Sequence, residues 1–222
     1  MKNTTSFALF LLCAFFTSYL PSATGAFVLD SDGNPLENGG TYYVPAPNNC
    51  GGIEYTTSGN ETCPITVVQH HDPTCKGFPI TISSPARIRY ISEGLNVNIG
   101  FTFRPPPCAP SSLWTVLKDQ SEHPDPYEGV ILPVKLNNED NSNNTVPGWF
   151  KIQKLPLDFI TTYYIVFCPL DQSPCWSVGS NFDQYGNRRL VVAQFARRQD
   201  IELQKLSYAS RSTHSSAWRS TT

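Results

Sequence analysis

The chain has 222 residues, a net charge of −2 and a charged fraction of only 15%. A net charge this close to zero produces no strong electrostatic field that would attract nucleic acids or anionic membranes, so we expect neither as a partner. Nineteen prolines and fourteen glycines, spread between short runs of β-branched and aromatic residues, favour an all-β domain rich in turns.

Residues 1–25 have the features of a secretory signal peptide. A basic residue, Lys2, precedes an apolar run over residues 7–16, and small residues at 23–25 suit cleavage. The mature chain then begins at Ala26, and no later apolar run approaches the roughly 18 residues of a membrane span.

The mature part is long enough for one domain, which we place at residues 26–206. Residues 207–222 are mostly Ser, Thr, Arg and Ala and are predicted to be a disordered tail. Between these limits the pattern predicts about twelve short strands and no amphipathic helix. The clearest strands are 41–44, 53–56, 64–69, 80–83, 96–103, 113–117, 149–152, 163–167 and 189–193, with long loops at 119–126 and 137–147.

The stretch SSPARIRY, residues 83–90, allows two interpretations. Arg87 and Arg89 alternate with Ile88 and Tyr90, as in an edge strand that uses charge against aggregation. Alternatively, Pro85 stiffens a substrate-like loop that offers Arg87 to a protease with an acidic specificity pocket, as trypsin has. The local pattern by itself favours the edge strand.

Six cysteines remain after Cys13 is assigned to the signal peptide. An even number in a secreted chain predicts three disulfides, although six cysteines allow 15 pairings and their spacing selects none of them. They are Cys50, Cys63, Cys75, Cys108, Cys168 and Cys175.

Other chemistry has little support in the sequence. His70 and His71 beside Asp72 and Cys75 lack the ligand spacing of a metal site, so we expect neither a metal nor a cofactor. A nucleophile elbow and a phosphate loop are both missing, and we expect no enzyme activity. Asn60 and Asn143 begin glycosylation sequons in predicted turns, where modification is plausible in a secretory protein.

Three parts of the chain carry a family resemblance. They are FVLDSDGNPLENGGTYYV at 27–44, GNETCPITVVQ at 59–69 with ISSPARIRY at 82–90, and GWF at 148–150 with YIVFCP at 164–169 and NRRLVV at 187–192. These stretches resemble the plant Kunitz-type, soybean-trypsin-inhibitor-like family from Ala26 to about Leu206. The resemblance implies a β-trefoil with three units of four strands.

The resemblance also implies a function and its residues. It places the primary specificity residue at Arg87 and the scissile bond between Arg87 and Ile88, within a reactive loop that we define as residues 84–89. The other loop residues are Ser84, Pro85, Ala86 and Arg89. It further implies that the Asn38 side chain supports this loop, although Asn38 before two glycines is also an ordinary turn residue. We therefore expect a monomeric inhibitor of trypsin-like serine proteases, secreted or vacuolar.

The family's two usual disulfides correspond to Cys63 with Cys108 and Cys168 with Cys175. Cys50 and Cys75 depart from the four-cysteine pattern, and we expect them to form a third pair, with free or intermolecular thiols as the alternatives.

Two other functions remain open at this point. A trefoil with altered loops could be a storage protein or a binding module for a carbohydrate or pigment. Alternatively, the long loop over residues 119–147 could inhibit a cysteine protease, subtilisin or amylase. Loss of function on replacing Arg87 in a folded protein would separate these from the first hypothesis.

Overall fold

The computed structural model describes residues 25–45, 51–103, 105–118, 130–137, 142–155, 162–171, 174–194 and 199–206. The predicted signal peptide up to residue 24, the tail at 207–222, Cys50 and most of the 119–147 loop lie outside these ranges, so the expectations about them stay predictions.

The described residues form short strands and one short 3-10 turn, η1. The strands are β1 (Gly40–Tyr43), β2 (Ile53–Thr56), β3 (Thr66–Gln69), β4 (Ile80–Ser83), β5 (Asn98–Phe101), β6 (Trp114–Val116), β7 (Ile131–Leu136), β8 (Gly148–Lys154), β9 (Tyr163–Pro169), β10 (Trp176–Phe182), β11 (Arg188–Ala193), β12 (Asp200–Ile201) and β13 (Gln204–Lys205), and η1 is Ser142–Asn144. The all-β prediction is confirmed, and none of the described helices is long and apolar enough to cross a membrane.

Seven of these strands close into a barrel. Antiparallel pairing joins β13 to β1, β1 to β4 and β4 to β5, and likewise β8 to β9 and β9 to β12. The bridge between Val97 and Phe150 connects the β5 and β8 sides. Because β12 and β13 are consecutive pieces of one closing segment, the barrel is left without a free edge, which protects it from edge-to-edge aggregation.

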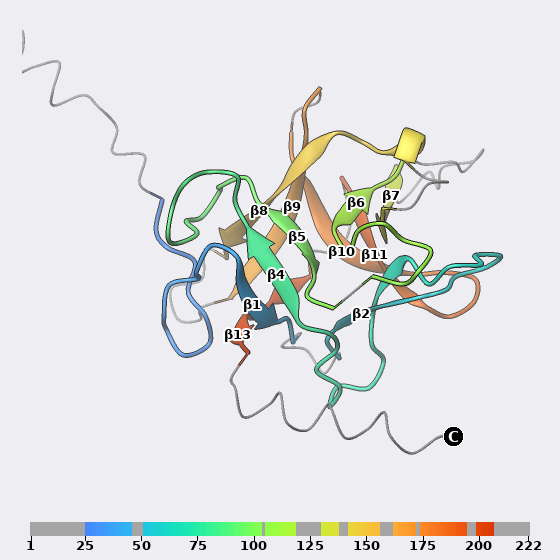
Figure 1. The fold of residues 1–222 in the computed structure, drawn as a ribbon, viewed down its shortest axis with the longest axis horizontal. Helices are drawn as coiled ribbons and strands as arrows, with labels where there is room; N and C mark the ends of the chain where they lie inside the picture. The colour runs from blue at the N-terminus through green and yellow to red at the C-terminus, as the bar shows by residue number, and fades with distance from the viewer. Residues whose placement is uncertain are drawn as a thin grey trace, which may run out of the picture.

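Three hairpins, β2–β3, β6–β7 and β10–β11, cover one end of the barrel (Figure 1). They are tied to one another because β3, β7 and β11 pair among themselves. Each third of the chain thus supplies barrel strands and one hairpin, and the predicted β-trefoil is confirmed.

Alternating side chains fill the interior. In β4, Ile80 and Ile82 are fully buried while Thr81 and Ser83 are half-buried. Burial of one such isoleucine stabilises the fold by about 1.5–3 kcal/mol. A chain of contacting rings then crosses the barrel, with successive ring centroids between 5.2 and 6.2 Å apart, formed by Phe101, Trp114, Phe150 and Phe167.

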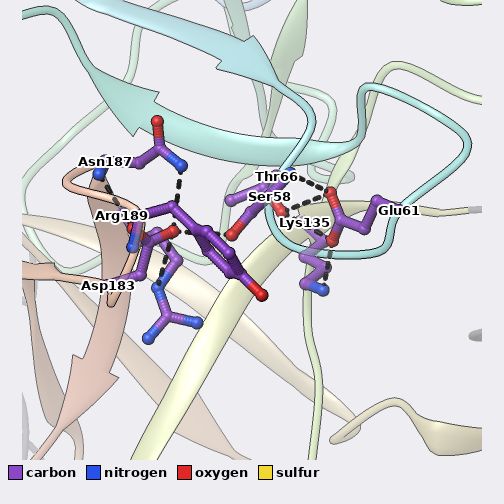
Figure 2. A network of polar contacts seen from close by, with 8 residues as sticks. Ser58, Glu61, Thr66, Lys135, Asp183, Asn187 and Arg189 are labelled. Carbon is purple, nitrogen blue, oxygen red and sulfur yellow. Dashed lines mark hydrogen bonds and ion pairs between the residues drawn. The ribbon is translucent and has the colours of Figure 1, made fainter.

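A polar network links all three hairpins of the cap, as Figure 2 shows. The Ser58 hydroxyl, after β2, donates to the Asp183 carboxylate, after β10, at 2.6 Å. Glu61 accepts a hydrogen bond from Thr66 of β3 and pairs with Lys135 of β7. These contacts fix the hairpin ends that face away from the barrel.

Disulfides join Cys63 to Cys108 and Cys168 to Cys175, the two pairs that the resemblance implies. The first connects the β2–β3 hairpin to the β5–β6 connection across 45 residues, and the second closes the β9–β10 turn. Cys75 has no disulfide partner among the described residues, and its expected partner Cys50 is not one of them.

Candidate reactive site

The reactive loop leaves β4 and belongs to no strand. Its residues Pro85, Ala86, Arg87, Ile88 and Arg89 are all exposed. In Figure 1 it is part of the green connection between β4 and β5, on the side of the molecule opposite the tips of the β2–β3 and β10–β11 hairpins. The edge-strand interpretation is therefore wrong for residues 84–89.

The loop backbone is hydrogen-bonded by one side chain, that of Asn38, in place of a neighbouring strand. Its amide Nδ2 lies 3.3 Å from the Ser84 carbonyl oxygen, 3.2 Å from that of Ala86 and 3.1 Å from that of Ile88. Its Oδ1 accepts the Ser84 N–H at 2.7 Å. Asn38 thus contacts residues on both sides of the Arg87–Ile88 bond.

The backbone next to Asn38 also holds both ends of the loop. Gly39 N–H donates to the Ile82 carbonyl before the loop at 2.8 Å, and Asn38 N–H donates to the Arg89 carbonyl after it at 2.9 Å. A further bond, from Ile91 N–H to the Leu36 carbonyl, continues this ladder. Residues 36–39 are thus hydrogen-bonded to the chain on both sides of the loop and hold its two ends at a fixed separation.

Short contacts also restrict the loop internally. Ile88 N–H donates to the Ala86 carbonyl at 2.9 Å, so Arg87 is the central residue of a three-residue turn. Ala86 N–H lies 3.3 Å from the Ser84 hydroxyl oxygen, and Pro85 fixes one further φ angle.

The two loop arginines have different surroundings. Among the described residues, Arg87 forms no ion pair or ring contact, so its guanidinium can enter a partner's pocket without breaking one. The Arg89 guanidinium lies over the Tyr90 ring, 5.1 Å from its centroid, and Tyr90 in turn meets Phe27 edge-on. Arg87 is the cation that the loop presents.

Cys75 lies beside Glu54 and His70, with ligand atoms within 4.8 Å of one another. The Nδ1 atom of His70 accepts the Asp72 N–H at 3.0 Å, so a neutral His70 carries its proton on Nε2, toward Glu54. A metal-bound histidine has the opposite arrangement, in which the second ring nitrogen donates a proton. These three residues therefore do not fit a metal site.

Both sequon asparagines are exposed. Asn60 follows Gly59, which has a φ of 63°, in the connection between β2 and β3, and Thr62 is exposed as well. Asn143 is in η1, while its sequon Thr145 is half-buried.

The family model described as trypsin and protease inhibitor, the legume Kunitz type, matches residues 28–205. The chain belongs to this family. Trypsin inhibitor A of Glycine max is 41% identical to this chain over an alignment of 201 residues, which covers 87% of this chain and 88% of that protein. Trypsin inhibitor DE-3 of Erythrina variegata is 38% identical over 170 residues, covering 75% and 91%.

A solved structure adds a complex to the comparison. Soybean trypsin inhibitor with porcine pancreatic trypsin, in an orthorhombic crystal form, matches with a TM-score of 0.69 at 38% identity, covering 82% of this chain and 99% of that one. The resemblance to the Kunitz family is therefore confirmed.

Proposed function

We propose that this protein inhibits trypsin-like serine proteases by presenting the Arg87–Ile88 bond as a substrate that is held in place. The observation that carries the proposal is the contact of one Asn38 side chain with the carbonyls of Ala86 and Ile88, on either side of that bond. Family membership supports the same conclusion, as does an exposed Arg87 that forms no ion pair within the described part of the chain.

Rigidity provides the affinity. A flexible peptide loses conformational freedom when it binds, whereas a loop already held in one shape loses little, so more of the contact energy appears as binding. Arg87 would insert into the acidic specificity pocket and form charge-assisted hydrogen bonds with its carboxylate.

The same support explains why cleavage does not release the protease. The protease serine oxygen bonds to the Arg87 carbonyl carbon, the bond to Ile88 nitrogen breaks, and the protease histidine gives its proton to the new Ile88 amine. Asn38 still holds Ser84 and Ala86 on one side and Ile88 on the other. The amine therefore stays beside the acyl-enzyme, and reformation of the bond competes with hydrolysis.

The wider setting belongs to the same proposal. The N-terminal apolar segment and the disulfides favour entry into the secretory pathway, followed by secretion or vacuolar storage. We infer a monomer whose partner is the protease, without a nucleic-acid or membrane partner, because the closed barrel requires no second copy and the net charge is small.

Titration of trypsin with the mature protein tests the proposal. The natural protein should abolish activity at a one-to-one ratio, and Arg87→Ala should lose this inhibition while its circular dichroism stays unchanged. Arg89→Ala is the matched control, because it removes an arginine two residues away in the same loop and should still inhibit trypsin.

Equal inhibition by the natural protein and Arg87→Ala would refute the assignment, and no inhibition by either would favour a storage or binding role. That role has less support, because the relatives that match this chain along most of its length are trypsin inhibitors.

A further inference from the structure

The side chain of Asn38 is aimed by a tight turn over residues 37–40. Gly40 N–H donates to the Glu37 carbonyl at 2.9 Å, and Gly39 has a φ of 80°. A positive φ at the third position is what a type II turn requires, and glycine adopts it without strain. Asn38 is the second residue of this turn, so the direction of its amide depends on how the turn is seated.

Tyr42 of β1 contacts both ends of the turn. Its hydroxyl oxygen accepts the Glu37 N–H at 2.8 Å. At the other end, a Cβ atom added to Gly40 would lie 2.7 Å from that oxygen and 2.8 Å from the ring carbon Cε2, closer than any side chain tolerates. The turn is therefore packed directly on the phenol.

The Tyr42 side chain has no room to move away from the turn. The residue is 0% exposed and belongs to the hydrophobic core of the barrel. Burial also raises the pKa of Tyr42, so the hydroxyl is protonated at neutral pH.

We propose that Tyr42 is a positioning residue for inhibition: its hydroxyl fixes the 37–40 turn, which aims the Asn38 amide at the carbonyls of the reactive loop. This inference rests on the proposed function and deepens it. Tyr42 is buried and does not touch the protease, so its effect reaches the Arg87–Ile88 bond only through Asn38.

The barrel offers a matched control in Tyr163 of β9. Tyr163 is 1% exposed, and its hydroxyl oxygen accepts the backbone N–H of Leu29 at 2.9 Å. Tyr163→Phe thus removes the same atom, from the same depth, and the same kind of bond to the N-terminal segment. It leaves the turn at residues 37–40 untouched.

The first experiment incubates the disulfide-intact protein, Tyr42→Phe and Tyr163→Phe with catalytic amounts of trypsin until the ratio of cleaved to intact inhibitor is constant. We expect both variants to unfold at slightly lower urea concentration. Only Tyr42→Phe should raise the cleaved-to-intact ratio, by about fivefold for one lost hydrogen bond, because a looser turn gives the cleaved ends more freedom. Equal ratios in the two variants would overturn the proposal.

A second readout does not depend on trypsin. Nuclear magnetic resonance of the free protein follows solvent exchange of the Asn38 side-chain amide protons and of the Glu37 N–H. Both should exchange faster in Tyr42→Phe than in the natural protein and be unchanged in Tyr163→Phe. If the natural protein already exchanges its Glu37 N–H like an open amide, the hydroxyl contact does not exist and the proposal fails.

The two readouts separate the possible failures. Absence of trypsin inhibition by the natural protein would refute the proposed function, and the exchange measurement would then still decide whether Tyr42 positions the Asn38 amide. Unchanged Asn38 exchange in Tyr42→Phe would refute the positioning role alone, whatever the protease assay shows.

Discussion

Asn38 and Ile88 are 50 residues apart in the sequence, yet the Asn38 amide nitrogen lies 3.1 Å from the Ile88 carbonyl oxygen. The same nitrogen lies 3.2 Å from the Ala86 carbonyl oxygen. The residue that stabilises the loop is therefore remote from it along the chain, and the pairing of β1 with β4 brings the two together.

Replacement of Asn38 by aspartate should weaken inhibition while the fold survives. The carboxylate keeps the size of the amide but cannot donate hydrogen bonds, and it places negative charge among three carbonyl oxygens. The Asn38 amide nitrogen carries two hydrogens, and the loss of both hydrogen bonds that it can donate predicts at least about a tenfold weaker inhibition of trypsin. Residual trypsin activity, measured against the concentration of the inhibitor, gives the affinity. Mass spectrometry gives the fraction cleaved between Arg87 and Ile88.

Asn96→Asp is the control for Asn38→Asp, because Asn96 is exposed in the same connection between β4 and β5. It introduces the same charge without removing a contact to the loop. Equal effects of the two substitutions would mean that charge, and not the lost donors, weakens inhibition.

The family resemblance suggested the loop and its support by Asn38, but nothing in the sequence pointed to the part that Tyr42 plays. Arg87 and Arg89 alternate with apolar residues, so the local pattern favours an edge strand, and only the family resemblance selects the loop. The contact from Tyr42 to Glu37 has no sequence signature at all. An aromatic residue in a strand predicts burial, but which backbone group its hydroxyl meets depends on the folded turn.

Some strands could likewise be predicted from the local sequence pattern, and others could not. β4 was predicted with its exact bounds because Ile80 and Ile82 alternate with polar residues. The strands β7 and β10 were not predicted. Pro133 interrupts the otherwise alternating run of β7, and β10 has Gly179 at its centre and as many polar as apolar residues. Both are strands because β11 pairs with them, and that long-range pairing cannot be read from a local pattern.

We predict a disulfide between Cys50 and Cys75. Gly51 N–H donates to the His70 carbonyl at 3.0 Å, and Gly52 N–H donates to the Cys75 carbonyl at 2.7 Å. Gly51 is therefore hydrogen-bonded to the segment 70–75 that contains Cys75. Cys50 is its direct neighbour in the sequence, and the Cα atoms of consecutive residues are about 3.8 Å apart. Peptide mapping without reduction should recover residues 50 and 75 in one linked fragment. Alkylation of Cys75 in the unreduced protein would contradict the prediction.

We predict that Asn60 carries an N-linked glycan when the protein is made in a eukaryotic secretory host. Asn60 and Thr62 are exposed, whereas Glu61 between them is turned toward Thr66 and Lys135 and holds the turn (Figure 2). Asn60→Gln should lower the mass by one glycan, and enzymatic deglycosylation should remove the difference. Because Asn60 belongs to the β2–β3 hairpin, whose tip lies opposite the reactive loop in Figure 1, trypsin inhibition should not change. A mass difference of only the one methylene group by which Gln exceeds Asn would refute modification at Asn60.

Asp183 should make the stability of the cap depend on pH in the acid range. Burial opposes its ionisation, but hydrogen bonds from Ser58, from Asn187 and from the Tyr185 N–H outweigh burial and lower the pKa of Asp183 from 3.8 to about 2. A carboxyl group whose pKa is lower in the folded state stabilises that state fully above the unfolded value. This stabilisation is lost as the pH falls from about 4 toward 2.

Asp183→Asn should therefore lower the free energy of unfolding by about 2 kcal/mol at pH 6, because bonds to a charged acceptor become bonds to a neutral one. At pH 2 the difference between the variant and the natural protein should shrink, since the carboxyl group is then about half protonated in the folded protein and almost fully protonated in the unfolded chain. Urea unfolding at pH 6, 4, 3 and 2 measures both curves. Asp32→Asn, at an exposed turn position, should leave the curve unchanged. A deficit in Asp183→Asn that is as large at pH 2 as at pH 6 would show that the side chain's shape, and not its charge, holds the hairpins together.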